Sequence, residues 1–171
     1  MLFRSNRKDF GYGDLRDLLA GVDVVTKKLP IDPDRIGLTG WSYGGFMTMF
    51  AVTQTHRFRA AVAGAGISNW ESYYGENSID QWMIPFFGAS VYDDPAVYAK
   101  SSAIGFIKNA KTPMLIFWGL RDFVFDRHFL RLWEERFPRA ETHRFEDCGH
   151  YILEDAREEI LPSVRNFLER T

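Results

Sequence analysis

Apolar residues along the chain follow two spacings, which predict helices and strands in alternation. Between Gly11 and Leu29 they recur every three or four positions, as on one face of a helix, and Pro30 ends this pattern. Short apolar runs between turn residues predict strands. The pattern predicts helices over 11–29, 44–55, 127–137 and 156–170, and strands over 35–39, 60–65, 114–118 and 142–145.

This alternation predicts an α/β fold, with a mostly parallel sheet and helices on both faces. The length of 171 residues is typical of one domain. Residues 68–111 are aromatic and polar by turns. Because long loops without secondary structure are rare, we expect short helices around 71–74, 79–86 and 95–100. We interpret 68–111 as a helical insertion over the candidate site.

The first ten residues are basic and are not typical of the first strand of such a domain. The chain reaches a predicted helix before any strand, so we expect a partial, N-terminally truncated domain over 1–171. We expect residues 1–10 to be disordered or a non-native start. They lack the apolar core of a secretory signal, and we expect a cytoplasmic protein.

Composition and charge restrict the possible functions. The chain has 46% hydrophobic and 26% charged residues, as globular proteins do. Its net charge of −2 gives no electrostatic reason to bind nucleic acid or an anionic membrane. No apolar run approaches the ~20 residues of a membrane span. Cys148 is the single cysteine, which excludes an internal disulfide and a multi-cysteine metal site. We expect no metal and no cofactor.

One motif with catalytic potential lies between a predicted strand and a predicted helix. It reads Gly40-Trp41-Ser42-Tyr43-Gly44-Gly45 and fits the G-x-S-x-G pattern of a nucleophile elbow. In such an elbow Ser42 stands on a strained turn, and a side chain at Gly40 or Gly44 would collide with neighbouring backbone. The N–H of Tyr43 would point at a developing oxyanion. The alternative is a glycine-rich turn in which Ser42 has no chemical role.

A serine nucleophile needs a base and an orienting acid, and in this type of sheet the acid and then the histidine follow the serine along the chain. Asp122 follows the strand predicted over 114–118, and His150 follows the one over 142–145. Both loops would lie at the C-terminal edge of the sheet, where α/β sites form. We predict His150 as general base and Asp122 as the residue that orients it, with Asp126 as the alternative acid.

The remaining candidate side chains have simpler interpretations. His56, His128 and His143 are expected on the surface or in the core, and Cys148 is expected to be a small buried side chain rather than a reactive thiol. Two alternatives stay open for the aromatic residues of 68–111, which either line a substrate pocket or pack in the core. These are Trp70, Tyr73, Tyr74, Trp82, Phe86 and Phe87.

Together with the elbow, several stretches resemble the prolyl oligopeptidase family of serine peptidases, in its C-terminal α/β-hydrolase domain. The resemblance is nearest to the acylaminoacyl-peptidase and dipeptidyl-peptidase-like branch. It covers about residues 10–113 and rests on 32–37, 40–47, 51–55 and 58–62. It implies an α/β-hydrolase fold, Ser42 as nucleophile, and a peptide or acyl-peptide substrate.

Two departures from that family leave alternatives open. Residues 114–119 and 145–155 look more like general α/β hydrolases of the haloalkane-dehalogenase and epoxide-hydrolase type, although those carry aspartate where this chain has Ser42. The chain is therefore either continuous with the family or a chimera of two hydrolase segments. The family's second oxyanion donor comes from a preceding part, so Tyr43 N–H would act alone. A carboxylesterase-like hydrolase and a catalytically dead fragment are the alternative functions.

The same resemblance places the strand over 35–39 in mid-sheet, next to strands that would belong to the preceding part. Without those strands, one side of it has unpaired N–H and C=O groups. An uncovered apolar edge is a template for pairing with another chain. We expect possible self-association through this edge, in addition to a peptide or small acyl substrate as partner.

Overall fold

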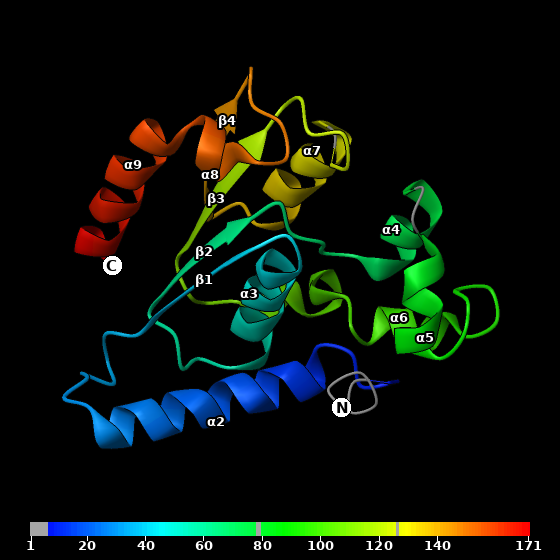
Figure 1. Ribbon diagram of the computed structural model, residues 1–171, viewed down its shortest axis with the longest axis horizontal. Coiled ribbons are helices and arrows are strands. Elements are labelled where there is room, and N and C mark those ends of the chain that lie inside the picture. The colour runs from blue at the N-terminus through cyan, green and yellow to red at the C-terminus, as the bar shows by residue number, and fades with distance from the viewer. Residues whose placement is uncertain (1–6, 78–79, 126) are drawn as a thin grey trace.

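The computed structural model describes residues 7–77, 80–125 and 127–171 (Figure 1). Its elements in chain order are α2 (Tyr12–Lys28), β1 (Gly37–Trp41), α3 (Tyr43–Gln54), β2 (Ala60–Gly64), α4 (Trp70–Glu76), η1 (Asp80–Trp82), α5 (Met83–Phe87), α6 (Pro95–Ala99), η2 (Ala103–Asn109), β3 (Met114–Gly119), α7 (Arg127–Arg136), β4 (Glu141–Phe145), α8 (Ile152–Asp155) and α9 (Arg157–Arg170). The elements η1 and η2 are 3-10 helices. None of these described helices combines the length and the apolar character needed to cross a membrane.

The four strands form one parallel sheet in the order β1–β2–β3–β4. Parallel neighbours need long crossover connections, which α3, the helical segment 68–111 and α7 supply. The α/β fold predicted from the alternating pattern is therefore confirmed. Because all strands point the same way, the loops that follow them meet at one edge of the sheet.

Helices cover both faces of the sheet, and β3 shows this most directly. Met114, Ile116 and Trp118 belong to the larger core cluster, to which α3 and α7 contribute. Leu115 and Phe117 point to the opposite face and pack in a smaller cluster with α8 and α9. Figure 1 shows α3 and α7 on one side of the sheet and α9 on the other. Burial on both faces explains why β3 is a continuous apolar run rather than an alternating one.

Strand β1 begins and ends two residues later than the sequence pattern predicts. Gly40 pairs with Ala63 and Trp41 pairs with Gly64, so strand pairing continues up to the residue before Ser42. Glycine has a low strand propensity, which hides this end of the strand from sequence reasoning. Ser42 therefore lies immediately after the end of β1, at the C-terminal edge of the sheet.

Three helical regions also differ from the prediction. The helix predicted over 79–86 is divided into η1 and α5, with residue 79 outside the described residues. The helix predicted over 156–170 is α9, and a separate single turn, α8, precedes it. The 3-10 helix η2 was not predicted. Such short turns are built from a few residues, too few to produce a periodic pattern.

Of the first ten residues the structure describes 7–10, of which Phe10 lies in the core while Arg7 and Lys8 are exposed; residues 1–6 lie outside the described residues, and the expectation of a disordered or non-native start over 1–10 stays a prediction. The Lys8 N–H donates to the Phe86 carbonyl at 2.8 Å. Phe10 is only 3% exposed, and the Ser101 hydroxyl donates to its carbonyl at 2.8 Å. A lone buried aromatic residue gives no periodic signal in the sequence.

The segment 68–111 contains short helices. Two hydrogen bonds join its first residues to residues near its end. The Ile104 N–H donates to the Ser68 carbonyl at 3.1 Å, and the Trp70 N–H donates to the Ser102 hydroxyl at 2.9 Å. Its aromatic side chains mainly pack in the core rather than line a pocket. Trp70, Tyr73, Tyr74 and Phe87 are buried, and Trp82 and Phe86 pack against them half-buried.

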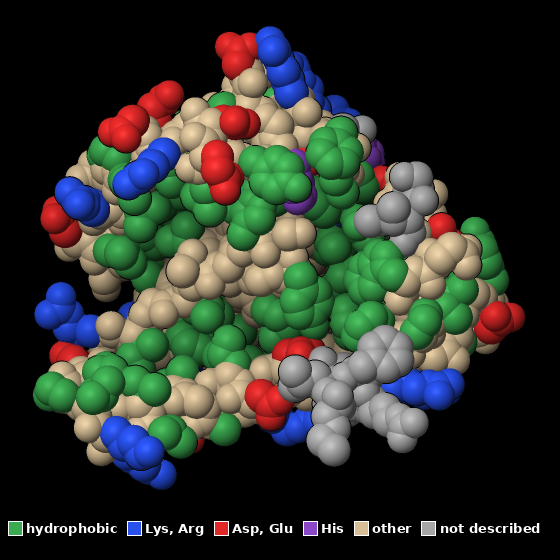
Figure 2. Space-filling view, viewed as in Figure 1, with side chains coloured by type: hydrophobic (Ala, Val, Ile, Leu, Met, Phe, Trp, Pro, Cys, Tyr) green, Lys and Arg blue, Asp and Glu red, His purple; other side chains and the backbone are tan. Residues whose placement is uncertain are grey.

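Within the described residues, β1 is an edge strand that pairs with β2 alone. Gly37 and Thr39 on this strand are exposed. The second half of α2 also exposes the apolar side chains of Val24 and Val25, and Leu29 is exposed just after its end. Hydrophobic side chains are visible at this end of α2 in Figure 2. The chain therefore presents an unpaired strand edge together with an apolar stretch of helix surface.

Glycines let the backbones of β1, α3 and β2 touch at the end of β1. A Cβ on Gly40 would lie 2.2 Å from the Gly44 carbonyl oxygen, and a Cβ on Gly45 would lie 2.3 Å from the Gly64 carbonyl oxygen. A Cβ on Gly44 would meet no atom within 4 Å. The prediction that a side chain at Gly44 would collide is therefore wrong. The sterically constrained positions are Gly40 and Gly45.

These contacts predict opposite effects for two adjacent substitutions. Gly45→Ala forces a Cβ into the β2 backbone and should lower the free energy of unfolding by about 1–3 kcal/mol or more. Gly44→Ala has open space in a helix and should leave it unchanged or raise it by up to about 1 kcal/mol. Urea unfolding of both variants is the measurement. Equal stability of the two variants would show that α3 and β2 do not pack this closely.

Candidate active site

The residues predicted from the sequence lie in the loops at the C-terminal edge of the sheet. Ser42 follows β1, Asp122 follows β3 and His150 follows β4. In α/β sheets this is the edge at which ligand sites form. Different contacts position each of these three loops.

Ser42 connects β1 to α3 in a strained conformation. Its φ of 53° and ψ of −113° lie in a region that few non-glycine residues adopt. The Ser42 N–H donates to the Gly64 carbonyl at 3.0 Å, and the Ser42 carbonyl accepts the Phe46 N–H at 3.0 Å. Serine at this position of a helix usually caps it, but the Ser42 hydroxyl makes no capping bond. The hydroxyl is therefore not used to stabilise α3.

Asp122 is buried at the end of β3, with 8% of its surface exposed. Its Oδ1 accepts the N–H of Val124 at 2.7 Å and the N–H of Phe125 at 3.1 Å. These bonds hold the carboxylate in a tight turn, so only Oδ2 remains for another partner. The rival acid of the sequence prediction, Asp126, lies outside the described residues.

A close backbone contact at Gly119 brings the loop after β4 over the loop after β3. A Cβ on Gly119 would lie 2.3 Å from the Gly149 carbonyl oxygen and 2.6 Å from that of Cys148. The Arg121 N–H donates to the Cys148 carbonyl at 2.9 Å. Because Gly119 has no side chain, the two loops can touch. This contact places His150 beside Asp122.

His150 and Asp122 form a hydrogen bond between Nδ1 and Oδ2 of 2.9 Å. A carboxylate can only accept, so Nδ1 donates and the lone pair lies on Nε2. Both side chains are largely buried, at 12% and 4% exposed. A histidine in this tautomer can take a proton through Nε2 while the carboxylate stabilises the resulting imidazolium.

Aromatic rings surround the His150 imidazole. The ring of Trp41 lies 6.1 Å from it between centroids, and the rings of Phe125 and Tyr151 lie 5.9 and 5.5 Å away. Trp41 is the residue just before Ser42, so the ends of β1 and of the His150 loop are neighbours. Within residues 7–77, 80–125 and 127–171, no hydrogen bond joins the Ser42 hydroxyl to His150. The structure therefore joins Asp122 with His150 and brings Trp41, the residue before Ser42, next to this pair.

The other histidines lie elsewhere. His56 is exposed after α3, and His128 is exposed on α7. His143 lies in β4, where its Nε2 is 2.9 Å from a carboxylate oxygen of Glu141. Burial, together with nearby acidic residues, raises the pKa of the Cys148 thiol, which keeps it in its unreactive protonated form.

A small cavity of about 130 Å³ lies near the Asp122–His150 pair, with Phe125 as the link between them; neither Asp122 nor His150 is among its lining residues. Phe125, whose ring contacts His150, lines it together with Tyr73 and Trp133. The rings of Tyr73 and Phe125 stack at 5.8 Å. Burial, and secondarily the Asp122 charge, raise the pKa of Tyr73. Sequence reasoning did not identify Phe125, although its position three residues after Asp122 was a signal. Tyr73 was among the aromatic residues left open.

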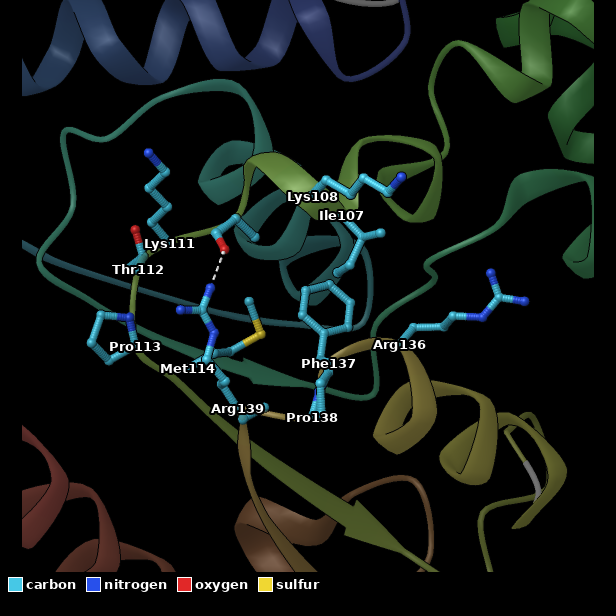
Figure 3. A pocket seen from close by; sticks show the side chains of 12 residues that line it. Ile107, Lys108, Lys111, Thr112, Pro113, Met114, Arg136, Phe137, Pro138 and Arg139 are labelled. Carbon is cyan, nitrogen blue, oxygen red and sulfur yellow. Dashed lines mark hydrogen bonds between the residues drawn. The ribbon is translucent and has the colours of Figure 1, made fainter.

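A second cavity of about 390 Å³ lies at the opposite, amino edge of the sheet. Figure 3 shows Arg139 reaching across it toward the Ala110 carbonyl, to which it donates at 3.3 Å. Its other lining residues include Lys108, Lys111 and Met114, and none of the predicted site residues. Among the described residues, no three histidine, cysteine or acidic side chains gather closely enough to hold a metal.

Comparisons with known proteins assign a family to the chain. A family model described as the prolyl oligopeptidase family matches residues 2–170. The uncharacterized peptidase YuxL of Bacillus subtilis is 41% identical over 118 residues, which cover 68% of this chain and 18% of that protein. A cis-3-alkyl-4-alkyloxetan-2-one decarboxylase of Shewanella oneidensis is 56% identical over 64 residues, covering 37% of this chain and 20% of that protein.

The solved structures give the same result for the fold. The uncomplexed acylaminoacyl peptidase of Pyrococcus horikoshii superposes with a TM-score of 0.88 at 26% identity, covering 99% of this chain and 29% of that one. This chain spans about a fifth of the length of the two curated relatives named above. The single family model, over 2–170, covers 10–113 and all but the last residue of 114–171, the two stretches that differ in their resemblance. The chain has the α/β-hydrolase fold and belongs to the prolyl oligopeptidase family of serine peptidases.

Proposed function

We propose that this chain is a serine hydrolase, and specifically a peptidase that cleaves peptides or acyl-peptides through an acyl-enzyme on Ser42. The observation that carries the proposal is the buried hydrogen bond between Asp122 and His150, at the sheet edge where Ser42 stands with its hydroxyl unused by α3. The names of the related acylaminoacyl and acylamino-acid-releasing enzymes support the choice of substrate class.

In this mechanism the Ser42 Oγ attacks the substrate carbonyl carbon while its proton passes to Nε2 of His150. Asp122 keeps Nδ1 protonated and stabilises the imidazolium. When the tetrahedral intermediate collapses, His150 returns the proton to the leaving amine. Water then attacks the acyl group on Ser42, with His150 again as base. Hydrogen bonds of such sites often form fully only with substrate present.

The oxyanion of the intermediate would be held by the N–H of Tyr43. Tyr43 is the first residue of α3, and the side chain of Ser42 makes no capping hydrogen bond to this helix. The first N–H groups of a helix have no partner within it, and they favour negative charge. A Cβ on Gly44 would meet no atom within 4 Å, so the space beside Tyr43 has room for a substrate carbonyl. The small cavity lined by Tyr73 and by Phe125, whose ring contacts that of His150, would accept an apolar substrate group.

A carboxylesterase of the same mechanism is the alternative within enzymes, and a catalytically dead fragment is the alternative outside them. Hydrolysis of an aminoacyl anilide in preference to a short-chain ester favours the peptidase. The reverse preference favours the esterase. A chain that a fluorophosphonate does not label is the dead fragment, because such labelling requires an activated serine.

The nucleophile is tested by Ser42→Ala. We expect this variant to lose all fluorophosphonate labelling and all hydrolysis, with little change in its unfolding curve, because the Ser42 hydroxyl stabilises no neighbour. Ser163→Ala on α9 serves as control and should label like the unchanged chain. Labelling that survives in Ser42→Ala would place the nucleophile elsewhere.

The orienting acid is tested by Asp122→Asn. The amide oxygen can still accept the N–H groups of Val124 and Phe125, so the fold should persist. Loss of the charge and of the tautomer preference should slow labelling by about 10⁴-fold. Asp147→Asn is the matched control, since the Asp147 side chain is 81% exposed on the same loop as His150. An unchanged labelling rate in Asp122→Asn would remove Asp122 from the mechanism.

The proposal extends to self-association of this chain through β1. Within the part of the chain that the structure describes, one edge of this strand is unpaired, and α2 exposes apolar residues nearby. Light scattering should therefore give a mass above 19.8 kDa that rises with concentration. Thr39→Lys places a charge on the exposed strand and should shift the chain toward the monomer. A stable monomer of the unchanged chain at tens of micromolar would contradict this part.

A further inference from the structure

The side chain of Tyr43 links the elbow to helix α2. Its hydroxyl donates a hydrogen bond of 2.8 Å to Oδ2 of Asp14, in the first turn of α2. The two residues are 29 positions apart in the chain, so this contact depends on how α2 packs against α3. Asp14 belongs to a helix that otherwise lies outside the candidate site.

The Tyr43 ring is also fixed by packing. Its centroid lies 5.2 Å from that of Phe10 and 5.4 Å from that of Phe46. Burial raises the pKa of Tyr43 well above its usual value, and the hydrogen bond to Asp14 adds to this. The hydroxyl therefore remains a donor at all ordinary pH values. Held at the ring and at the hydroxyl, Tyr43 has little freedom to rotate.

Asp14 is itself held in place by the start of α2. The same Oδ2 accepts the N–H of Gly11 at 3.2 Å. Gly11 has a φ of 84°, and a Cβ there would lie 2.9 Å from the Phe46 ring, so this turn is packed directly against α3. The ring of Tyr12 contacts that of Phe50 at 4.9 Å. The first turn of α2 is thus a fixed support for the Tyr43 side chain.

This support bears on the backbone at the elbow. Ser42 supplies no capping bond, and its strained φ must be maintained by its surroundings. The Tyr43 N–H is the donor assigned above to the oxyanion, and its direction follows the orientation of the peptide plane between Ser42 and Tyr43. A side chain anchored at its far end restricts rotation of that plane.

We propose that Asp14 is a positioning residue for the reaction: through the Tyr43 hydroxyl it holds the first residue of α3 so that the Tyr43 N–H stays aimed at the oxyanion. This inference rests on the proposed function. It assigns to α2 a role in transition-state stabilisation in addition to its packing role. Positioning errors of about 1 Å can cost about 10²-fold in rate.

The test compares Tyr43→Phe, Asp14→Ala, Asp14→Asn and the double variant of the first two. The rate constant for fluorophosphonate labelling of Ser42 is the first readout. Tyr43→Phe removes one oxygen and leaves the Gly11–Asp14 bond intact, so it should fold normally yet label about tenfold more slowly. This is less than the about 10²–10³-fold cost of deleting an oxyanion donor. Asp14→Asn keeps an acceptor and should retain most of the rate.

Two further comparisons separate positioning from general destabilisation. The double variant should label no more slowly than Asp14→Ala, because both substitutions remove the same bond. Asp17→Ala, an exposed position on the same helix, should label at the rate of the unchanged chain. Thermal unfolding of each variant shows whether the helix remains folded. Additive losses that follow the melting temperature would overturn the proposal.

A readout without chemistry keeps this test distinct from that of the proposed function. The amide ¹H–¹⁵N signal of Tyr43 should broaden or split in Asp14→Ala and stay sharp in Asp17→Ala. If Ser42 in the unchanged chain is not labelled, the proposed function fails, while a broadened Tyr43 signal still supports the positioning of the elbow by Asp14. An unchanged signal overturns the positioning role. A labelling rate of Tyr43→Phe equal to that of the unchanged chain overturns it as well.

Discussion

Direct backbone contact at the C-terminal edge of the sheet is the constraint on which the candidate site depends. Gly40 faces the Gly44 carbonyl, Gly45 faces the Gly64 carbonyl, and Gly119 faces the Gly149 carbonyl. None of the first residues in these pairs can carry a Cβ without displacing main-chain atoms. The first two contacts fix the strained turn at Ser42, and the third brings the loop after β4 over the loop after β3. These backbone contacts therefore fix the positions of the loops from which the side chains of the site extend.

The polar side chains of the site, Asp122, His150 and Ser42, differ in the contacts that they make. Asp122 uses one oxygen to close its own turn and the other to bind His150. Aromatic rings enclose the imidazole and reduce its contact with water, which strengthens the bond to the buried carboxylate. Ser42 leaves its hydroxyl unused in the helix cap, so α3 lacks a stabilising interaction at the position of the proposed nucleophile. Sites that violate a local rule in this way are typical of functional positions.

Much of this arrangement was predictable from the sequence because its determinants are local. The elbow motif, the Gly119-to-Asp122 stretch and the Cys148-to-His150 stretch each follow a segment that the sequence predicts as a strand. The end of β1 was misplaced because glycines interrupt its apolar pattern. Gly44 was counted with Gly40 as sterically constrained, because a motif does not show which positions face another backbone. Asp14 could not be found from the sequence, since its contact with Tyr43 depends on how α2 packs against α3. The core position of Phe10 is likewise a tertiary property that has no periodic signal.

The central claim is that Ser42, His150 and the Tyr43 N–H converge on one reacting group. A crystal structure of the chain after reaction with a fluorophosphonate tests it most directly. The account predicts phosphorus bonded to Ser42 Oγ, a phosphonyl oxygen about 2.7–3.1 Å from the Tyr43 nitrogen, and His150 Nε2 within about 3.2 Å of an oxygen of the adduct. An adduct on another residue, or one on Ser42 whose oxygen points away from Tyr43 and from His150, would contradict it.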